Sequence, residues 1–215
     1  MLALRSLRYH PATASEAVLR GVDLELQAGR PALVAGRSGS GKSTLLELIC
    51  GLADPSGGTI CWNGQPLTAR QRRWLCGLVF QFPERHFLGL SVGQELKLGQ
   101  RRLPSEKAAT VLEQVGLEGV SLQQAPERLS GGQQRRLTLA VQLLRNPKVL
   151  LLDEPTAGLD WSVRGEILDL LRTLGRDRVL LVVTHEPELF DALVEPNQRH
   201  RLEGGLIHCT AASHR

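Results

Sequence analysis

A glycine-rich segment near the start of the chain has the composition and spacing of a phosphate-binding loop. Residues 36–43 read Gly-Arg-Ser-Gly-Ser-Gly-Lys-Ser, which fits the pattern G-x-x-x-x-G-K-[ST] between a predicted strand and a predicted helix. Glycines let the backbone curl so that successive N–H groups point at phosphate oxygens, and the helix N-terminus adds a favourable dipole. Lys42 supplies charge to the terminal phosphates, and the Ser43 hydroxyl can ligate Mg²⁺. The predicted nucleotide contacts are Gly36, Ser38, Gly39, Ser40, Gly41, Lys42, Ser43 and Thr44.

Two adjacent carboxylates, Asp153 and Glu154, follow the apolar run Val149–Leu152. Open α/β sheets bind their ligands at the carboxyl ends of such strands, and Asp153 suits the ligand shell of Mg²⁺. Because neighbouring strand residues point to opposite faces, Glu154 is expected to take a different role and to polarise an attacking water. An ordinary acidic loop is the alternative for this pair taken alone, and the phosphate-binding loop argues against it.

A histidine stands at the same predicted sheet edge. His185 follows the apolar run Val179–Val183 and Thr184, which places it near the expected γ-phosphate. We expect a neutral imidazole that donates a hydrogen bond to phosphate without carrying a full charge.

The elements that must position these groups alternate between strands and helices. Strands are predicted at residues 2–9, 22–26, 32–35, 59–62, 75–80, 149–152 and 179–183. Helices are predicted from the loop to Gly51, at 106–115 after a Ser105 cap, at 133–145 and at 163–174. Asn63-Gly64 is a hairpin signal, and the strand–helix–strand order of residues 149–183 indicates a parallel sheet. The fold class is therefore α/β.

The helix expected at residues 133–145 is amphipathic, because apolar residues recur at helical spacing. Its apolar stripe consists of Leu137, Ala140, Val141 and Leu144. The residues expected on other faces are Arg135, Arg136 and Gln142.

Composition narrows the class of protein. A chain of 215 residues with 42% hydrophobic and 22% charged residues suits one globular domain. No apolar run approaches the roughly 20 residues of a membrane-spanning helix, and the N-terminus lacks the pattern of a secretory signal. Cys50, Cys61, Cys76 and Cys209 form no C-x-x-C pair, which favours free thiols in a reducing compartment. The net charge of +4 is carried by scattered residues, so no nucleic-acid partner is predicted.

The segment Leu129-Ser130-Gly131-Gly132-Gln133 matches the signature of the ABC ATPase family, and the other motifs stand in that family's order. They are Tyr9 as the adenine-stacking aromatic, Gly36–Ser43, Gln81 as the coupling-loop glutamine, Leu129–Gln133, Val149–Glu154, Ala157–Asp160 as the dimer-contact loop, and His185. The resemblance covers nearly the whole chain. It implies ATP hydrolysis with ATP and Mg²⁺, with Gln81, Glu154 and His185 as catalytic residues and with Ser43, Gln81 and Asp153 at the metal.

The same resemblance implies the architecture. It is a P-loop NTPase core with a parallel sheet, an N-terminal antiparallel β subdomain and an inserted α-helical signature subdomain. We expect a single ABC ATPase domain over residues 1–215, with the nucleotide-binding core at about 1–81 and 146–215 and the helical subdomain at about 82–145.

The signature itself can bind an anion. Ser130, Gly131 and Gly132 open an amphipathic helix, followed by Gln133, and so form a second helix N-terminus suited to phosphate. One chain cannot aim both helix ends at one phosphate. The resemblance implies a head-to-tail dimer, identical or mixed, in which Ser130–Gln133 act in trans, Asp160 contacts the partner, and hydrolysis opens the pair.

The segment Val79–Gly89 resembles the coupling-loop region of energy-coupling-factor and cobalt-type importers, although His86 stands where that subfamily often has glutamine. This implies a cytoplasmic subunit, peripheral on the inner face of the cell membrane, that drives a separate transmembrane permease. A substrate-capture membrane subunit and a vitamin or metal ion as solute fit the same subfamily. Many such ATPases also continue into a C-terminal extension, whereas this sequence stops shortly after Gly204-Gly205.

Three alternatives stay open. A soluble ABC ATPase in cofactor or iron–sulfur assembly would carry the same motifs, whereas a small-molecule kinase would leave the signature without a role.

Phe82, Phe87 and Leu88 are either core residues or the lining of a groove for a partner helix. His200, His208 and His214 are too loosely spaced for a metal site and are read as a solvated tail.

Overall fold

The computed structural model describes residues 1–82 and 87–210. The strands are β1 (Leu2–Tyr9), β2 (Leu19–Leu26), β3 (Ala32–Ala35), β4 (Gly57–Trp62), β5 (Gln65–Pro66), β6 (Cys76–Val79), β7 (Val149–Asp153), β8 (Val179–Thr184), β9 (Arg199–Glu203) and β10 (Leu206–Cys209). The α-helices are α1 (Lys42–Cys50), α2 (Ala69–Leu75), α3 (Val92–Lys97), α4 (Ser105–Gln114), α5 (Gly131–Leu143) and α6 (Trp161–Leu174). Short 3₁₀ helices are η2 (Pro126–Arg128), η3 (Pro187–Phe190) and η4 (Pro196–Gln198).

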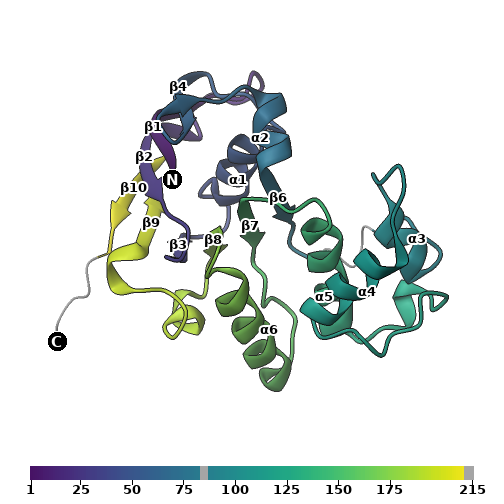
Figure 1. Ribbon diagram of the computed structural model, residues 1–215. Coiled ribbons are helices and arrows are strands. Elements are labelled where there is room, and N and C mark those ends of the chain that lie inside the picture. The colour runs from purple at the N-terminus through teal and green to yellow at the C-terminus, as the bar shows by residue number, and fades with distance from the viewer. Residues whose placement is uncertain (83–86, 211–215) are drawn as a thin grey trace.

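Two sheets organise the chain. A four-stranded antiparallel sheet has the order β2-β1-β4-β5, and a six-stranded sheet has the order β10-β9-β3-β8-β7-β6. All neighbouring strands of the larger sheet are parallel except the terminal hairpin β9–β10. Helix α1 lies between the two sheets, while α3, α4 and α5 gather beyond the β6 edge (Figure 1). This is the mixed α/β fold that the sequence predicted.

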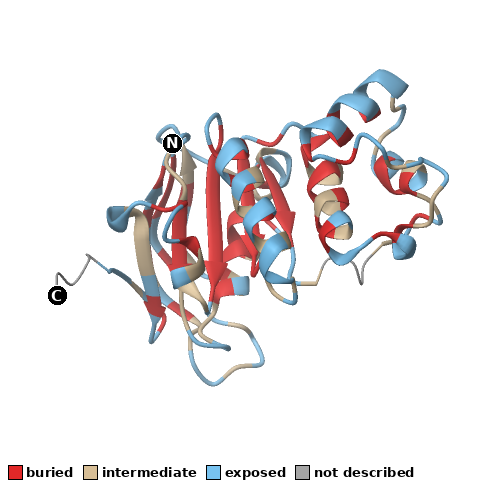
Figure 2. Ribbon diagram, turned by 90° about the horizontal axis from the view of Figure 1, so that it is seen from below, coloured by how far each residue is buried: buried red, intermediate tan, exposed pale blue. Residues whose placement is uncertain are grey.

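Strands β3, β6, β7 and β8 form the buried centre of the larger sheet (Figure 2). Their residues alternate between two cores, one on each face. Leu150 and Leu152 of β7 join a core shared with α3 to α6, which we call the helical-side core. Val149 and Leu151 join a core shared with α1 and the antiparallel sheet, the α1-side core. Both faces of the sheet are thus covered, and its carboxyl edge stays free to carry a site.

Local signals decide several element boundaries. Asn63 and Gly64 have φ of 49° and 82° in the turn between β4 and β5, which is the primed hairpin turn that their residue types predict. Helix α2, which the sequence analysis did not predict, begins with a capping box between Thr68 and Gln71. Because α2 takes Leu75, the strand expected at residues 75–80 is shortened to β6.

One prediction about helices was wrong. Ser105 is not a cap but the first residue of α4, because Pro104 holds the extended backbone of the cap position at φ −62° and ψ 141°. Arg135, which the sequence placed outside the apolar stripe of its helix, is buried as well, at 1% exposed. Helix α5 is covered on more than one side, so its apolar stripe alone does not define what is buried.

Other expectations concern what is absent. None of the helices within residues 1–82 and 87–210 is long and apolar enough to span a membrane. The four cysteines are unpaired, and burial raises the pKa of the Cys76 thiol to about 12. Pro83 to His86, part of the importer resemblance, and His214 lie outside the described residues.

Candidate functional site

The glycine-rich loop lies between β3 and α1 and ends in a helix N-terminus without a side-chain cap. The cap residue Gly41 has a φ of 98°, and a Cβ placed on it would meet Val18 Cγ1 at 2.8 Å. Both facts require glycine at this position. Lys42 is buried, and its Nζ donates to the carbonyl oxygens of Gly36 at 2.8 Å and Arg37 at 3.1 Å. The loop backbone therefore already wraps around the Lys42 side chain without ligand. The first N–H groups of α1 have no side-chain partner and can bind an anion.

A cavity of about 500 Å³ opens in front of this loop at the carboxyl edge of the sheet. Its lining brings together ten of the residues that the sequence singled out, and Val18. They are Ser38, Gly39, Gly41, Lys42, Ser43, Thr44, Gln81, Asp153, Glu154 and His185. Residues from four separate stretches of sequence thus meet at one place.

Asp153 ends β7 and lies against the loop. Ser43 Oγ donates to Asp153 Oδ2 at 2.6 Å. Burial raises the pKa of the Asp153 carboxyl, and the Ser43 hydrogen bond only partly opposes this. A carboxylate and a hydroxyl beside a phosphate site fit a Mg²⁺ ion that takes its remaining ligands from substrate and water. No group of three or more His, Cys, Asp or Glu side chains that could hold a metal occurs within the described residues.

Glu154 lies one residue beyond β7, where the backbone turns sharply. Its φ is 47°, and the side chain is almost fully buried. Oε2 accepts a hydrogen bond from Thr184 Oγ1 at 2.8 Å, Oε1 contacts His185 Nδ1 at 2.7 Å, and Lys42 Nζ lies 4.0 Å away. Both carboxylates line the same cavity but contact different partners. What separates them is this turn in the backbone, whereas strand alternation alone would have sent them to opposite faces.

His185 is hydrogen-bonded to Glu154. This hydrogen bond, reinforced by the charge of the carboxylate, raises the pKa of His185. The raised pKa works against the neutral imidazole that the sequence predicted. The side chain is 52% exposed, so the ring faces the open part of the cavity while Nδ1 stays on Glu154.

Some predicted contacts do not line this cavity. Tyr9, at the end of β1, is half-buried against the α1-side core. Gly36 lines a neighbouring cavity, described below. The side chain of Ser40 lies under the loop, where a Cβ on Gly36 would meet Ser40 Oγ at 2.5 Å. The backbone N–H of Ser40 donates to the carbonyl oxygen of Arg37 at 3.1 Å, so Ser40 holds the shape of the loop in this structure.

The signature lies at the other predicted helix N-terminus, that of α5. Ser130 is its cap: Oγ accepts from Gln133 N at 3.3 Å, and Gln133 Oε1 accepts from Ser130 N at 3.0 Å. Gly131 is exposed, whereas a Cβ on Gly132 would meet Val163 of α6 at 2.5 Å. Among the described residues that line the 500 Å³ cavity, none belongs to the signature.

The dimer-contact loop follows Glu154 and ends at Asp160. Asp160 is exposed at the N-cap of α6, and its carboxylate makes no side-chain cap bond. The buried Arg135 supports this loop, because its Nη2 donates to the carbonyl oxygen of Ala157 at 3.1 Å. The sequence did not indicate that Arg135 supports this loop or that Thr184 supports Glu154. The signal available for Thr184 was its place next to His185 at the end of an apolar strand.

A glycine-rich loop between the parallel strand β3 and a helix, with an aspartate and a glutamate at the carboxyl end of β7 in the same sheet, defines a P-loop nucleotide triphosphatase. The comparison with protein families takes this further. The ABC transporter family model matches residues 19–157, which is more than half of the chain, and the chain belongs to this family. It is an ATPase that binds ATP with Mg²⁺ as the usual partner.

The relatives carry several different names. A chloroplastic ABC transporter I family member 11 from Arabidopsis thaliana is 37% identical over 96% of this chain and 80% of its own length. The energy-coupling factor transporter ATP-binding protein EcfA2 of Latilactobacillus sakei is 35% identical over 84% of this chain and 68% of its own. A lipoprotein-releasing system ATP-binding protein LolD from Pseudomonas syringae is 37% identical over 96% of both chains.

A solved structure agrees with the fold. CbiO1 from Clostridium perfringens, described as part of the ABC transporter complex cbiONQ, has a TM-score of 0.85 and 28% identity, covering 96% of this chain and 86% of its own. The fold is thus that of an ABC ATPase, and the names of the relatives leave the solute undetermined.

Proposed function

We propose that this ABC ATPase is the motor subunit of a transporter and drives a separate permease subunit in the membrane. The observation that carries the proposal is the pairing of the cavity at the glycine-rich loop with two exposed leucines that follow Gln81 in the sequence. Leu88 and Leu90 are 80% and 82% exposed. Large apolar side chains displayed together in this way mark a protein contact.

Glu95 of α3 holds the backbone at Leu88 and Gly89. The Glu95 carboxylate is buried, and its Oε2 accepts from the backbone N–H groups of Leu88 at 2.9 Å and Gly89 at 2.7 Å. Phe87 packs against the helical-side core, whereas the two leucines point away from it. Phe87 therefore serves the core, and the leucines are the better candidates for a groove that receives a partner helix.

We assign the chemistry of ATP cleavage to the residues around the cavity. The N–H groups of the loop and Lys42 bind the β- and γ-phosphates, so that Lys42 exchanges its carbonyl partners for phosphate oxygens. Glu154 accepts a proton from the attacking water, and Thr184 and His185 fix the orientation of that carboxylate. Ser43, Asp153 and Gln81 would hold Mg²⁺, which supplies charge neutralisation of the phosphates when bound.

The complete site requires two chains. The signature of the same chain does not line the cavity, and its helix N-terminus is exposed. We therefore place ATP between the loop of one subunit and Ser130–Gln133 of the other, with Tyr9 against the adenine and Asp160 at the subunit contact. In this arrangement residues 1–81 and 146–215 form the nucleotide-binding core and residues 82–145 the helical part.

The type of transporter is proposed from the similarity to CbiO1 and EcfA2. These favour an importer of the energy-coupling-factor type that takes up a vitamin or metal ion, with the ATPase on the cytoplasmic face of the membrane. A mixed pair of ATPases and a substrate-capture membrane subunit belong to the same proposal.

Co-purification tests the transporter role. Tagged Glu154→Gln protein is isolated with ATP from detergent-solubilised membranes of the source, and its companions are identified by mass spectrometry. We expect an integral membrane protein whose identity points to the solute. Recovery of soluble proteins alone would replace the transporter by an assembly factor.

A matched pair of variants locates the contact. Leu88→Asp with Leu90→Asp is expected to abolish recovery of the membrane partner while ATP binding is retained. Leu206→Asp, at an exposed leucine of β10, is the control. Equal recovery with both proteins would move the permease contact away from the coupling loop.

A further inference from the structure

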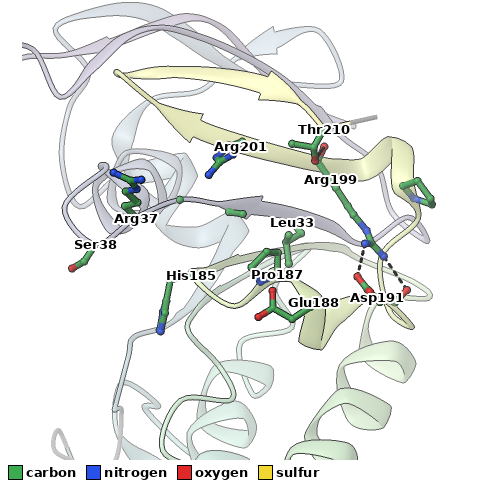
Figure 3. Close-up of a pocket in the computed structure, with 13 residues that line it drawn as sticks. Leu33, Arg37, Ser38, His185, Pro187, Glu188, Asp191, Arg199, Arg201 and Thr210 are labelled. Atoms are coloured by element: carbon green, nitrogen blue, oxygen red, sulfur yellow. Dashed lines mark hydrogen bonds and ion pairs between the residues drawn. The ribbon is translucent and has the colours of Figure 1, made fainter. Parts of the chain in front are cut away.

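A second cavity lies on the other side of the glycine-rich loop from the ATP site. Its volume is about 730 Å³, within the range of sites that hold a ligand or an anchor residue. Figure 3 shows Arg199, Arg201 and Thr210 extending from the β9–β10 side, with His185, Pro187 and Glu188 on the opposite wall. Leu33, Ala35, Pro187 and Pro196 give it an apolar lining. It shares Ser38 and His185 with the ATP site, whereas its walls from β9, β10 and η3 have no part in the chemistry assigned above.

The cations around it are not equally free. Arg199 is held by Asp191 and by the carbonyl oxygens of Asp191 and Val194. Arg37 is exposed, and its guanidinium makes no ion pair or hydrogen bond with another residue in the described part of the chain. The rim nearest the ATP site therefore offers one uncommitted positive charge.

A large apolar side chain stands exposed a short way from this cavity. Trp161 is 84% exposed at the first position of α6. Asp160 precedes it, with a carboxylate that makes no cap bond. A fully exposed indole beside a free carboxylate has the character of an anchor that becomes buried in a complex, since tryptophan is enriched among residues that carry binding energy.

Trp161 and the 730 Å³ cavity are both next to η3. Glu188 lines the 730 Å³ cavity and also a groove of about 300 Å³ that Trp161 borders. In a two-fold symmetric pair each contact occurs twice, so an anchor and its receptor that lie close together in one chain both come near the symmetry axis. In such a pair, Trp161 of each subunit can reach the cavity of the other.

From this we infer that Trp161 of one subunit inserts into the 730 Å³ cavity of a second copy when the ATP-bound pair closes. The indole ring packs on Leu33 and Pro187, and its N–H donates to Glu188 at the rim. The carboxylate of Asp160 meets Arg37, so the charges left free in each chain become paired. The inference rests on the head-to-tail pair proposed above and adds an anchor outside the ATP site. Closure of the pair would then place the indole next to the glycine-rich loop and His185, which also line this cavity.

Dimerisation of the Glu154→Gln protein with ATP and Mg²⁺ tests the anchor. Trp161→Ala in this background is expected to weaken the pair about tenfold or more in sedimentation velocity, while binding of a fluorescent ATP analogue to the monomer is unchanged. Trp74→Ala is the control, because Trp74 is 68% exposed on α2, at the far edge of the sheet. If Glu154→Gln itself forms no pair, the head-to-tail arrangement fails and this inference falls with it. If it pairs and Trp161→Ala pairs equally well, only the anchor is overturned.

Fluorescence tests the receptor cavity. In the same background with Trp62→Phe and Trp74→Phe, the emission of Trp161 is expected to shift to shorter wavelength on addition of ATP. Thr210→Phe, which fills the cavity from its exposed side, is expected to abolish the shift. A shift that survives Thr210→Phe would show that the indole is buried elsewhere and would overturn the assignment of the cavity.

Discussion

The two glycine-containing helix N-termini of this chain are prepared for phosphate in opposite ways. At α1 the cap is Gly41, no side chain occupies the first N–H groups, and a cavity of about 500 Å³ lies in front. At α5 the cap is Ser130, whose hydroxyl and reciprocal Gln133 contact already satisfy two donors. The first end is an open anion site, whereas the second is closed on itself.

This difference explains how the work is divided. The α1 end meets every titratable group assigned to the chemistry, so it can bind ATP in a single chain. The α5 end has its donors partly satisfied and lies away from those groups. In the proposed head-to-tail pair it meets phosphate only when a partner chain brings it. Substitutions at the two ends should therefore have different signatures, and the following predictions separate them.

The largest effect is expected from Glu154→Gln at the α1 end. Loss of the general base should lower ATP turnover about 10²–10⁴-fold, while ATP affinity is kept because the amide still fits between Thr184 and His185. Steady-state phosphate release together with fluorescent-nucleotide binding measures both quantities. Turnover within a few-fold of the native protein would remove Glu154 from the role assigned to it.

The next largest effect is expected from Lys42→Ala. Losing a charged hydrogen-bond donor to phosphate should weaken ATP binding about 10–100-fold. Lys148→Ala, at an exposed lysine before β7, should leave affinity unchanged and serves as the control. Unchanged binding by Lys42→Ala in a fluorescent-ATP titration would contradict the assignment of the loop.

A smaller, two-part effect is expected from Ser130→Ala at the α5 end. Loss of the cap should lower the free energy of unfolding by about 1 kcal/mol, and ATP turnover should fall while monomer affinity for ATP stays constant. Thr68→Ala removes the same kind of capping box from α2 and should cost similar stability without affecting turnover. Urea denaturation and ATPase assays on both variants make the comparison. Equal losses of turnover would mean that Ser130 matters only as a cap.

The smallest effect concerns the charge on His185. Because Glu154 raises its pKa, the pair stabilises the folded protein fully below the ordinary histidine pKa of about 6.5, and this contribution is lost as pH rises through the higher folded value. The ring is half exposed, so the change in stability is modest. NMR titration of the imidazole should show the pKa falling toward its ordinary value in Glu154→Gln. An unchanged pKa in Glu154→Gln would show that Glu154 does not control the protonation of His185.

The sequence predicted four of the six strands of the larger sheet and most of the residues in the cavity, because glycine spacing and apolar runs are local signals. It did not predict β9 and β10, where polar residues interrupt the apolar ones. It also missed what depends on tertiary packing. The raised pKa of His185 comes from Glu154, 31 residues away, and Arg135 donates to the loop at Ala157. Helix α2 is a different case: Thr68 and Gln71 stood at capping-box spacing, and that local signal was overlooked.

The composite site can be tested directly by mixing two defective chains in the Glu154→Gln background, one with Lys42→Ala and one with Ser130→Arg. Neither variant alone should form an ATP-stabilised pair, because each lacks one half of every site. A site built from two chains predicts that the mixture regains a pair with one intact site and about one occluded ATP. If mixing restores nothing, while each variant remains folded and Ser130→Arg still binds ATP as a monomer, the loop and the signature do not act on the same ATP from different chains.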